Sequence, residues 1–124
     1  MKIEKDLEDL LLNLNLKTDI DVLILEENKI IYFVGNTEKS IDYLYKTISN
    51  DLKRYIAQIT ELAICENDII PVLDDAPPYY MGEAIYRLKN TTDAIVFLKR
   101  NKKIGEEDII LIKAMIYLVD KFLK

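Results

Sequence analysis

Residues 106–124 read EEDIILIKAMIYLVDKFLK, and this stretch decides the fold because it predicts one long helix that is apolar around most of its circumference. Acidic residues open it and lysines close it, which suits the positive and negative ends of a helix dipole. No glycine or proline interrupts about five turns. A helix that lies on one sheet needs an apolar stripe of roughly 100°, and this stripe is wider. We therefore expect one side to contact the core and the other to contact a second helix or a second subunit.

The segment just before this helix predicts a β-hairpin over residues 83–99. Residues 83–89 alternate between apolar and polar side chains, which is typical of a half-buried strand. Residues 94–98 (AIVFL) are continuously apolar, as expected for a central strand that is covered on both faces. Residues 90–92 supply the turn between them.

The first part of the chain predicts a helix over residues 2–15 and a second hairpin over residues 19–34. Apolar residues of the helix repeat at the spacing of one helical face: Ile3, Leu7, Leu10, Leu11 and Leu14. In the hairpin, residues 21–26 (DVLILE) and 29–34 (KIIYFV) are β-branched, apolar runs. The tight turn between them contains Asn28, a residue type that tolerates positive φ.

The middle of the chain is less regular. Residues 38–58 predict two short helices, because Ser49 can cap the second one. Residues 61–65 are ambiguous between a helix end and a strand. Residues 68–73 (DIIPVL) predict a short strand at the sheet edge or an irregular crossing, since Pro71 has no N–H to donate to a neighbouring strand.

Together these elements predict an α+β fold for a single domain that spans residues 1–124. We expect a central antiparallel sheet of about five strands, with the first and last helices packed side by side on it. The length suits one core. Because half of the residues are hydrophobic and 31% are charged, the composition indicates a folded chain rather than a disordered one.

The composition argues against several classes of function. The chain has no histidine, which removes the most common general base and the most common zinc ligand. No phosphate-binding glycine loop is present, so we predict no enzyme, no cofactor and no metal site. The net charge is −5, and we interpret the basic run within residues 87–103 as a solvated loop rather than a nucleic-acid surface.

The same features predict a cytoplasmic protein. The single cysteine, Cys65, cannot form an intrachain disulfide, which suits a reducing compartment. The first residues contain no uninterrupted apolar segment of the signal-peptide kind. The last apolar run is broken by Lys113 and Asp120, which makes it a poor membrane span.

The best candidate for a binding site is the loop at residues 74–82 (DDAPPYYMG). Tyr79 and Tyr80, together with Tyr86, supply amphipathic rings of the kind that line ligand sites. The alternative is that these residues only cover the end of the core. The two aspartates that open the loop could bind a hard cation, but adjacent acids before a proline pair are more typical of a turn.

Three motifs occur in a fixed order: DVLILEENKIIYFVG at residues 21–35, YLYKTISNDL at residues 43–52, and the hairpin over 83–98 followed by Gly105-Glu106. In this order they resemble the GAF-like C-terminal domain of stage V sporulation protein T, a family of Firmicutes transcription regulators. The resemblance covers most of the chain. It implies a GAF- or profilin-like fold and a sensory or regulatory domain that dimerises through its terminal helices.

Two departures from the family pattern limit what the resemblance implies. The second hairpin turns through Asn-Thr-Thr-Asp, where the family usually has Gly-Asp and a further glycine. The family also carries a basic DNA-binding segment before this domain, and the present sequence begins directly at the first helix. No nucleic-acid contact is therefore expected from this chain.

Two functions remain open at this point. The first is a dimerising regulatory module that senses a small molecule near the loop at 74–82 and reports its presence through the terminal helices. The second is a dimeric scaffold of the Roadblock type, which binds another protein and no ligand. A formed pocket behind the three tyrosines would favour the sensor, whereas a filled sheet face with an exposed apolar groove would favour the scaffold.

Both functions predict a homodimer, because the last helix has more apolar surface than one sheet can cover. The predicted seam is a contact of four helices, two from each subunit. It includes Leu7, Leu11, Ile112, Ile116 and Val119. The alternative is that the first and last helices cover each other within one subunit.

Overall fold

The computed structural model describes residues 3–35, 43–65, 70–74, 81–89, 91–100 and 102–122. Their helices and strands are α1 (Lys5–Thr18), β1 (Ile20–Glu26), β2 (Lys29–Val34), α3 (Asn50–Gln58), β3 (Leu62–Cys65), β4 (Gly82–Arg87), β5 (Ala94–Lys99) and α4 (Glu106–Phe122). The strands form one five-stranded sheet in the order β2-β1-β5-β4-β3. Every neighbouring pair is antiparallel, which confirms the predicted α+β sheet.

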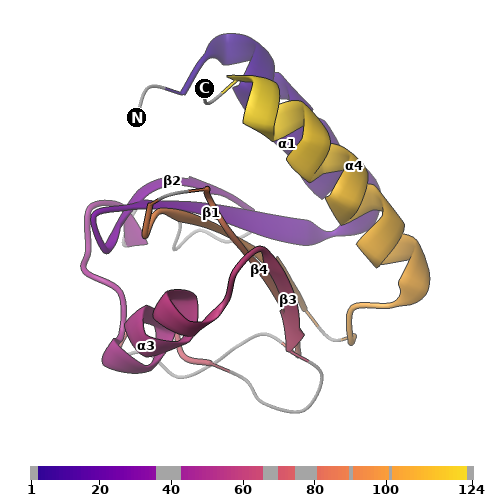
Figure 1. The fold of residues 1–124 in the computed structure, drawn as a ribbon. Coiled ribbons are helices and arrows are strands. Elements are labelled where there is room, and N and C mark those ends of the chain that lie inside the picture. Colours follow the sequence, from indigo (N-terminus) through magenta and orange to yellow (C-terminus); the bar gives the residue numbers. More distant parts are fainter. Residues whose placement is uncertain are drawn as a thin grey trace.

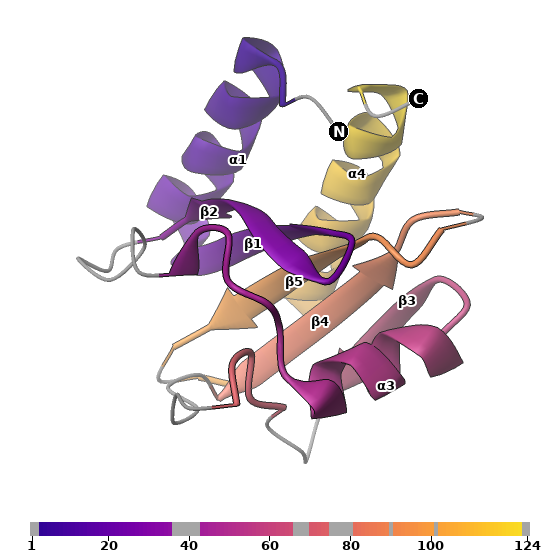
Figure 2. The same ribbon diagram turned by 90° about the vertical axis from the view of Figure 1, so that its left-hand side faces the viewer.

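The helices cover the two faces of this sheet unequally. Helices α1 and α4 lie side by side on one face, and α3 lies on the other (Figure 1). A view turned by 90° shows the same division, with α3 below the sheet and the two long helices above it (Figure 2). The prediction that the first and last helices pack together is thus confirmed.

Each face of the sheet has its own apolar core. On the α1/α4 face the fully buried residues include Leu7, Leu11, Ile20, Val22, Ile24, Ile95, Phe97, Ile112 and Val119. On the α3 face they include Leu23, Leu25, Ile30, Ile48, Leu52, Ile56, Ile85, Val96 and Leu98. Strand β5 contributes to both cores, because alternate residues of a strand point to opposite faces. This explains why residues 94–98 are continuously apolar.

The first hairpin closes through a two-residue turn at Glu27 and Asn28. Both residues have positive φ, 52° and 65°. This is the combination that a type I′ turn requires, and its twist matches that of the flanking strands. The backbone N–H of Glu27 also donates to the carboxylate of Asp93 at 3.1 Å, so the turn contacts the end of the second hairpin.

The structure decides between the alternatives left open in the middle of the chain. Residues 62–65 form strand β3, and the described residues 70–73 have no regular structure, as in the irregular-crossing alternative for residues 68–73. The first of the two helices predicted within residues 38–58 was wrong over residues 44–48, which form a turn and a bridge to β2, while residues 38–42 lie outside the described residues. Tyr45 has a φ of 64°, and its N–H donates to the carbonyl of Ile30. Backbone pairing to β2 replaces helical hydrogen bonds there. The second helix, α3, begins after Ser49 as predicted.

Candidate functional site

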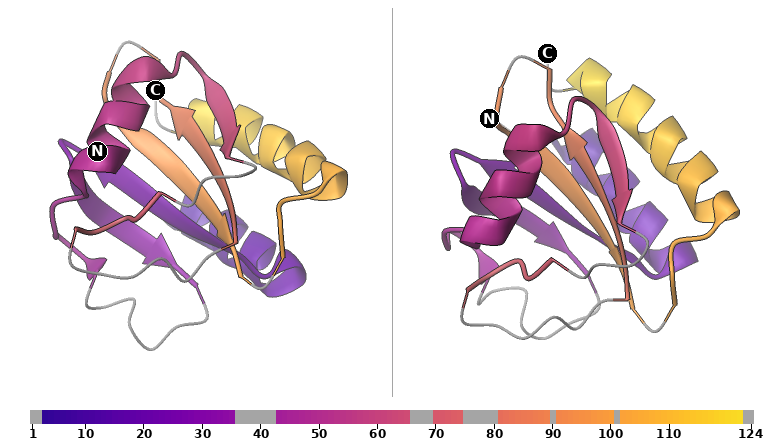
Figure 3. Two further views of the ribbon diagram at one scale, coloured as in Figure 1. Left: turned by 90° about the horizontal axis from the view of Figure 1, so that it is seen from below. Right: turned by 60° about the horizontal axis from the view of Figure 1, so that its bottom comes forward.

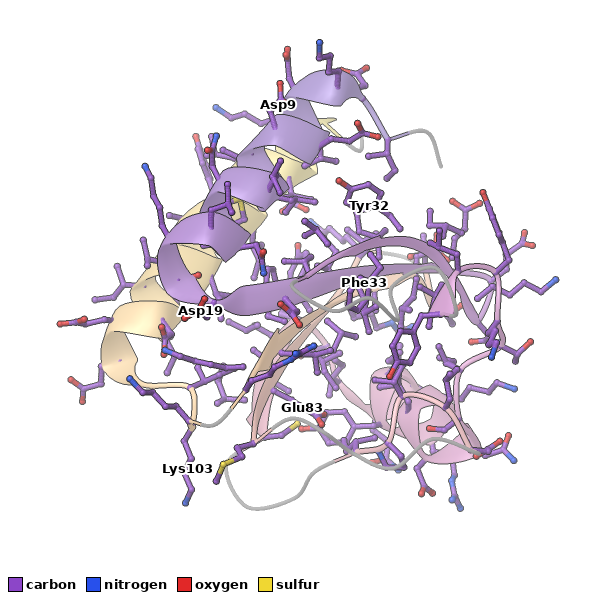
Figure 4. The ribbon with its side chains drawn as sticks, turned by 180° about the vertical axis from the view of Figure 1, so that it is seen from behind. Asp9, Asp19, Tyr32, Phe33, Glu83 and Lys103 are labelled. Carbon is purple, nitrogen blue, oxygen red and sulfur yellow. The ribbon has the colours of Figure 1, made fainter. Side chains whose placement is uncertain are left out.

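Two buried carboxylates lie in one row on the α3 face of the sheet. Asp21 in β1 and Glu83 in β4 both pair with Leu98 of the central strand β5. Directly paired residues point to the same face, and strands are about 4.8 Å apart, so the two acids are about 10 Å apart across Leu98. Asp21 is 1% exposed and Glu83 is 2% exposed. Figure 4 shows Glu83 on the side of the sheet away from the two long helices.

The Asp21 carboxylate contacts side chains from two other parts of the chain. The side-chain amide of Asn15, at the end of α1, donates to Asp21 Oδ1 at 2.8 Å and to the carbonyl of Ile20 at 2.9 Å. Arg100, just after β5, places Nη2 3.4 Å from Asp21 Oδ2. A Cβ atom on Gly35 would lie 2.7 Å from the carboxyl carbon, so a side chain at position 35 would displace this carboxylate. Asp21 therefore connects α1 to the residue after β5, in a position that requires glycine at residue 35.

Glu83 contacts an irregular segment, residues 70–74, that runs across the α3 face near the start of α3 (Figure 3). The N–H of Ile70 donates to Glu83 Oε1 at 3.2 Å. Burial raises the pKa of Glu83 to about 7, and the hydrogen bond from Ile70 offsets only part of that rise. Ser49 holds the same segment from the other side, donating through Oγ to the carbonyl of Pro71 and through N to that of Val72. The segment is thus fixed by polar contacts at both of its sides.

The residue before Arg100 connects β5 to the helix layer on the opposite face. Lys99 Nζ lies 2.8 and 2.7 Å from the two carboxylate oxygens of Asp108, in the first turn of α4. Asp108 Oδ2 also accepts from the N–H of Gly105 at 2.9 Å. Burial alone would raise the pKa of Asp108, but the hydrogen bonds from Lys99 and Gly105 hold this pKa below its usual value. The consecutive cations Lys99 and Arg100 therefore pair with carboxylates on opposite sides of the sheet: Lys99 with Asp108 and Arg100 with Asp21.

The tyrosines predicted to bind a ligand fall in two groups. Tyr79 and Tyr80 lie outside the described residues. Tyr86 lies in β4 and packs on the α1/α4 core, where its hydroxyl donates to the carboxylate of Asp120 at 2.9 and 3.1 Å. Burial and this carboxylate raise the pKa of Tyr86 to about 12. Tyr86 thus connects the sheet to the end of α4 and faces away from the row of Asp21 and Glu83.

This contact makes a direct prediction for Tyr86→Phe. The variant loses a half-buried hydrogen bond to a charged acceptor, so the free energy of unfolding should fall by about 1 kcal/mol. Urea unfolding at neutral pH measures the change. Tyr45→Phe is the control, because Tyr45 is 74% exposed and should show almost no change. Equal stability of the Tyr86 variant and the wild type would mean that the contact to Asp120 contributes nothing.

The residues predicted for the dimer seam are mostly buried within one subunit. Leu7, Leu11, Ile112 and Val119 are all 0% exposed, and Ile116 is half-buried. Within one subunit these four belong to the core under the two helices, and the seam that includes them stays a prediction. The apolar stripes of α1 and α4 pack against each other and against the sheet. This agrees with the alternative in which the first and last helices cover each other within one subunit. The large apolar residues that remain exposed on α1 and α4 are Leu12, Leu16, Ile110, Leu111, Tyr117 and Leu118.

Sequence reasoning missed Asp21, Glu83 and Arg100. The sequence did contain one signal for the two acids. Each lies near the start of an apolar strand, at a position where the alternation of side chains predicts that the residue points into the core. Within the described residues no three of His, Cys, Asp or Glu gather closely enough to hold a metal ion. No helix in the described ranges has the length and apolar character to cross a membrane.

No model of a known protein family matches this chain. The curated proteins give no match either.

Proposed function

We propose that this chain is a GAF-like regulatory module that forms homodimers and senses a small polar molecule on the α3 face of its sheet. The observation that carries the proposal is the row of the buried carboxylates Asp21 and Glu83, of which Glu83 contacts the irregular segment at residues 70–74. The resemblance to the C-terminal domain of sporulation regulators supports the same proposal. The proposed role is transcription regulation in the cytoplasm, without catalytic activity of the module itself.

Stability alone does not account for two buried carboxylates on this face. Burying a carboxylate is unfavourable unless it is well paired, and an apolar residue of similar size often stabilises a core more. The Glu83 carboxylate accepts one hydrogen bond in the described structure, and burial strongly raises its pKa. Such perturbed groups occur preferentially at functional sites. A small molecule that donates hydrogen bonds would satisfy this carboxylate after residues 70–74 move aside.

The charged contacts explain how binding of such a molecule could affect the two long helices. Asp21 contacts Asn15 in α1 and Arg100 after β5. The adjacent Lys99 contacts Asp108 in the first turn of α4. A ligand that competes for Asp21 or Arg100 would therefore change the contacts of both long helices, which carry the exposed apolar residues.

A Roadblock-type scaffold is the second candidate. The observation that favours it is that described side chains fill both faces of the sheet, while exposed apolar residues lie on α4. A scaffold would use that exposed surface for another protein and would need no ligand.

Native mass spectrometry of protein purified from its own host tests the two candidates together. For the sensor we expect a dimer that carries a bound small molecule, identified by its extra mass. Asp21→Asn and Glu83→Gln should each lose that mass, whereas Glu61→Gln, which changes an exposed acid near β3, should keep it. The identified compound should then raise the melting temperature of the wild type, because a ligand that binds only the folded state stabilises it.

Two results would contradict the sensor. One is a dimer without any bound compound, and the other is a bound compound that stays in both variants. The first would favour the scaffold, and the second would place the ligand elsewhere. Tyr79→Ala and Tyr80→Ala extend the same assay to the loop at residues 74–82, since loss of the thermal shift in a folded variant would assign those rings to the site.

A further inference from the structure

Helix α4 has a second apolar strip, on the side that faces away from the sheet. Ile110 and Tyr117 are 68% and 65% exposed, and Leu111 and Leu118 are 43% and 38% exposed. Ala114, at the centre of the helix, is also exposed. At 100° per residue these five positions lie on one side of the helix. Positions 111, 114 and 118 have the three- and four-residue spacing of a coiled-coil contact.

Opposite charges mark the two ends of this strip. Glu107 is exposed one turn before Ile110, and Lys121 is exposed one turn after Tyr117. Lys121 Nζ lies 4.5 Å from the centre of the Tyr117 ring, so its charge stays next to the strip. Glu107 and Lys121 are each seven residues from Ala114. The strip therefore consists of apolar side chains, with the small Ala114 at its midpoint. An acidic residue lies at one end and a basic residue at the other.

We propose that two copies of the chain associate by packing α4 against α4 of the second copy in antiparallel orientation, with Ala114 on the two-fold axis. In this arrangement Ile110 lies opposite Leu118 of the second copy, and Leu111 lies opposite Tyr117. Ala114 meets its own symmetry mate, and a small residue there lets the two helices approach closely. This proposal deepens the proposed function, because it specifies the surface through which the module dimerises.

The charges select this orientation over the parallel one. In the antiparallel pair each Glu107 lies opposite Lys121 of the second copy, which gives two attractive pairs. In a parallel pair each of these residues would face its own copy, which gives two like-charge contacts. Exposed ion pairs contribute little to affinity, so they set the orientation, while the four large apolar side chains of each copy supply the association.

Cysteine cross-linking tests the position of the axis. Ala114→Cys places two thiols face to face on the axis, so mild oxidation of the full chain should give a covalent dimer that a reductant reverses. Cys65 is a native thiol, so wild type treated in the same way measures the background. Gln58→Cys is the matched control, because Gln58 is exposed on α3 at the opposite face of the sheet and should stay monomeric on the gel.

Sedimentation equilibrium tests the charges and the strip. Glu107→Lys should weaken the dimer about tenfold, as should Lys121→Glu, and the double exchange of both residues should restore wild-type affinity. Ile110→Asp should weaken it by roughly a hundredfold or more, since it buries a carboxylate in the contact. The circular dichroism spectrum of this variant should stay unchanged, because Ile110 is exposed in the subunit.

The outcomes separate this inference from the proposed function. If the wild type is dimeric, but Ala114→Cys does not cross-link and the charge variants bind as tightly as the wild type, the antiparallel seam is overturned. The dimeric sensor would then stand with another seam. A wild-type chain that stays at single-chain mass at every concentration would overturn both the seam and the proposed dimer. A bound compound in native mass spectra would still support the sensing part in that case.

Discussion

Replacing Asp21 with alanine is expected to lower the free energy of unfolding by about 3 kcal/mol. The carboxylate is 1% exposed, accepts a hydrogen bond from Asn15 and forms an ion pair with Arg100. Removing one partner of a buried ion pair usually costs about 3–5 kcal/mol, because the other partner stays buried. The Arg100 side chain is 33% exposed, so water can solvate part of its charge, and the lower end of that range applies.

Asp21→Asn separates shape from charge in the same experiment. The asparagine keeps an oxygen for the amide of Asn15 but removes the negative charge opposite Arg100. We therefore expect an intermediate loss of about 1–2 kcal/mol. Urea unfolding at one fixed protein concentration measures both variants, since association shifts apparent stability. If alanine and asparagine give the same small loss, the contacts of Asp21 do not hold α1 and β5 together.

Replacing Glu83 with glutamine is expected to stabilise the protein at high pH. Burial raises the pKa of Glu83 from 4.5 to about 7, so between these values the folded state keeps a proton that the unfolded state has released. Stability that is present below about pH 4.5 is then lost as pH rises through about 7. At about 1.4 kcal/mol per pKa unit, the total loss is about 3 kcal/mol.

Glutamine removes this loss and retains a side-chain oxygen for the N–H of Ile70. At pH 8 the Glu83→Gln variant should therefore be more stable than the wild type by up to about 3 kcal/mol, and the two should converge near pH 4. Urea unfolding across this pH range gives both curves. Glu61→Gln serves as the matched control, because Glu61 is exposed. Parallel curves for Glu83→Gln and the wild type would show that Glu83 ionises normally in the folded state.

The architecture could be predicted because its strongest signals are local. Alternation in residues 83–89, the continuous run at 94–98 and the turn around Asn28 each indicate one strand or turn without knowledge of the rest of the chain. The segment around Tyr45 shows where prediction from local patterns fails. The segment with Tyr45 has helical spacing, but its backbone pairs with β2, and a tertiary hydrogen bond of that kind leaves no periodic pattern.

The site could not be predicted in the same way, because it depends on register. Asp21 and Glu83 are 62 positions apart, and only the pairing of both with Leu98 places them in one row. The sequence alone could not decide the dimer seam for a related reason. A stripe such as Leu7 and Leu11 shows that one face of a helix is buried, but it does not say whether the same subunit or a second one covers it.

The pairing of β1 with β5 has a consequence for biosynthesis. Strand β1 begins at residue 20 and β5 ends at residue 99, so most of the chain must leave the ribosome before the middle of the sheet can close. Until then the inner edge of β1 is unpaired and apolar, which invites pairing with another chain. A β5 strand from a second nascent copy would satisfy that edge equally well. Translation of several copies close together should therefore favour exchanged strands, whereas refolding at low protein concentration should favour the correctly closed subunit.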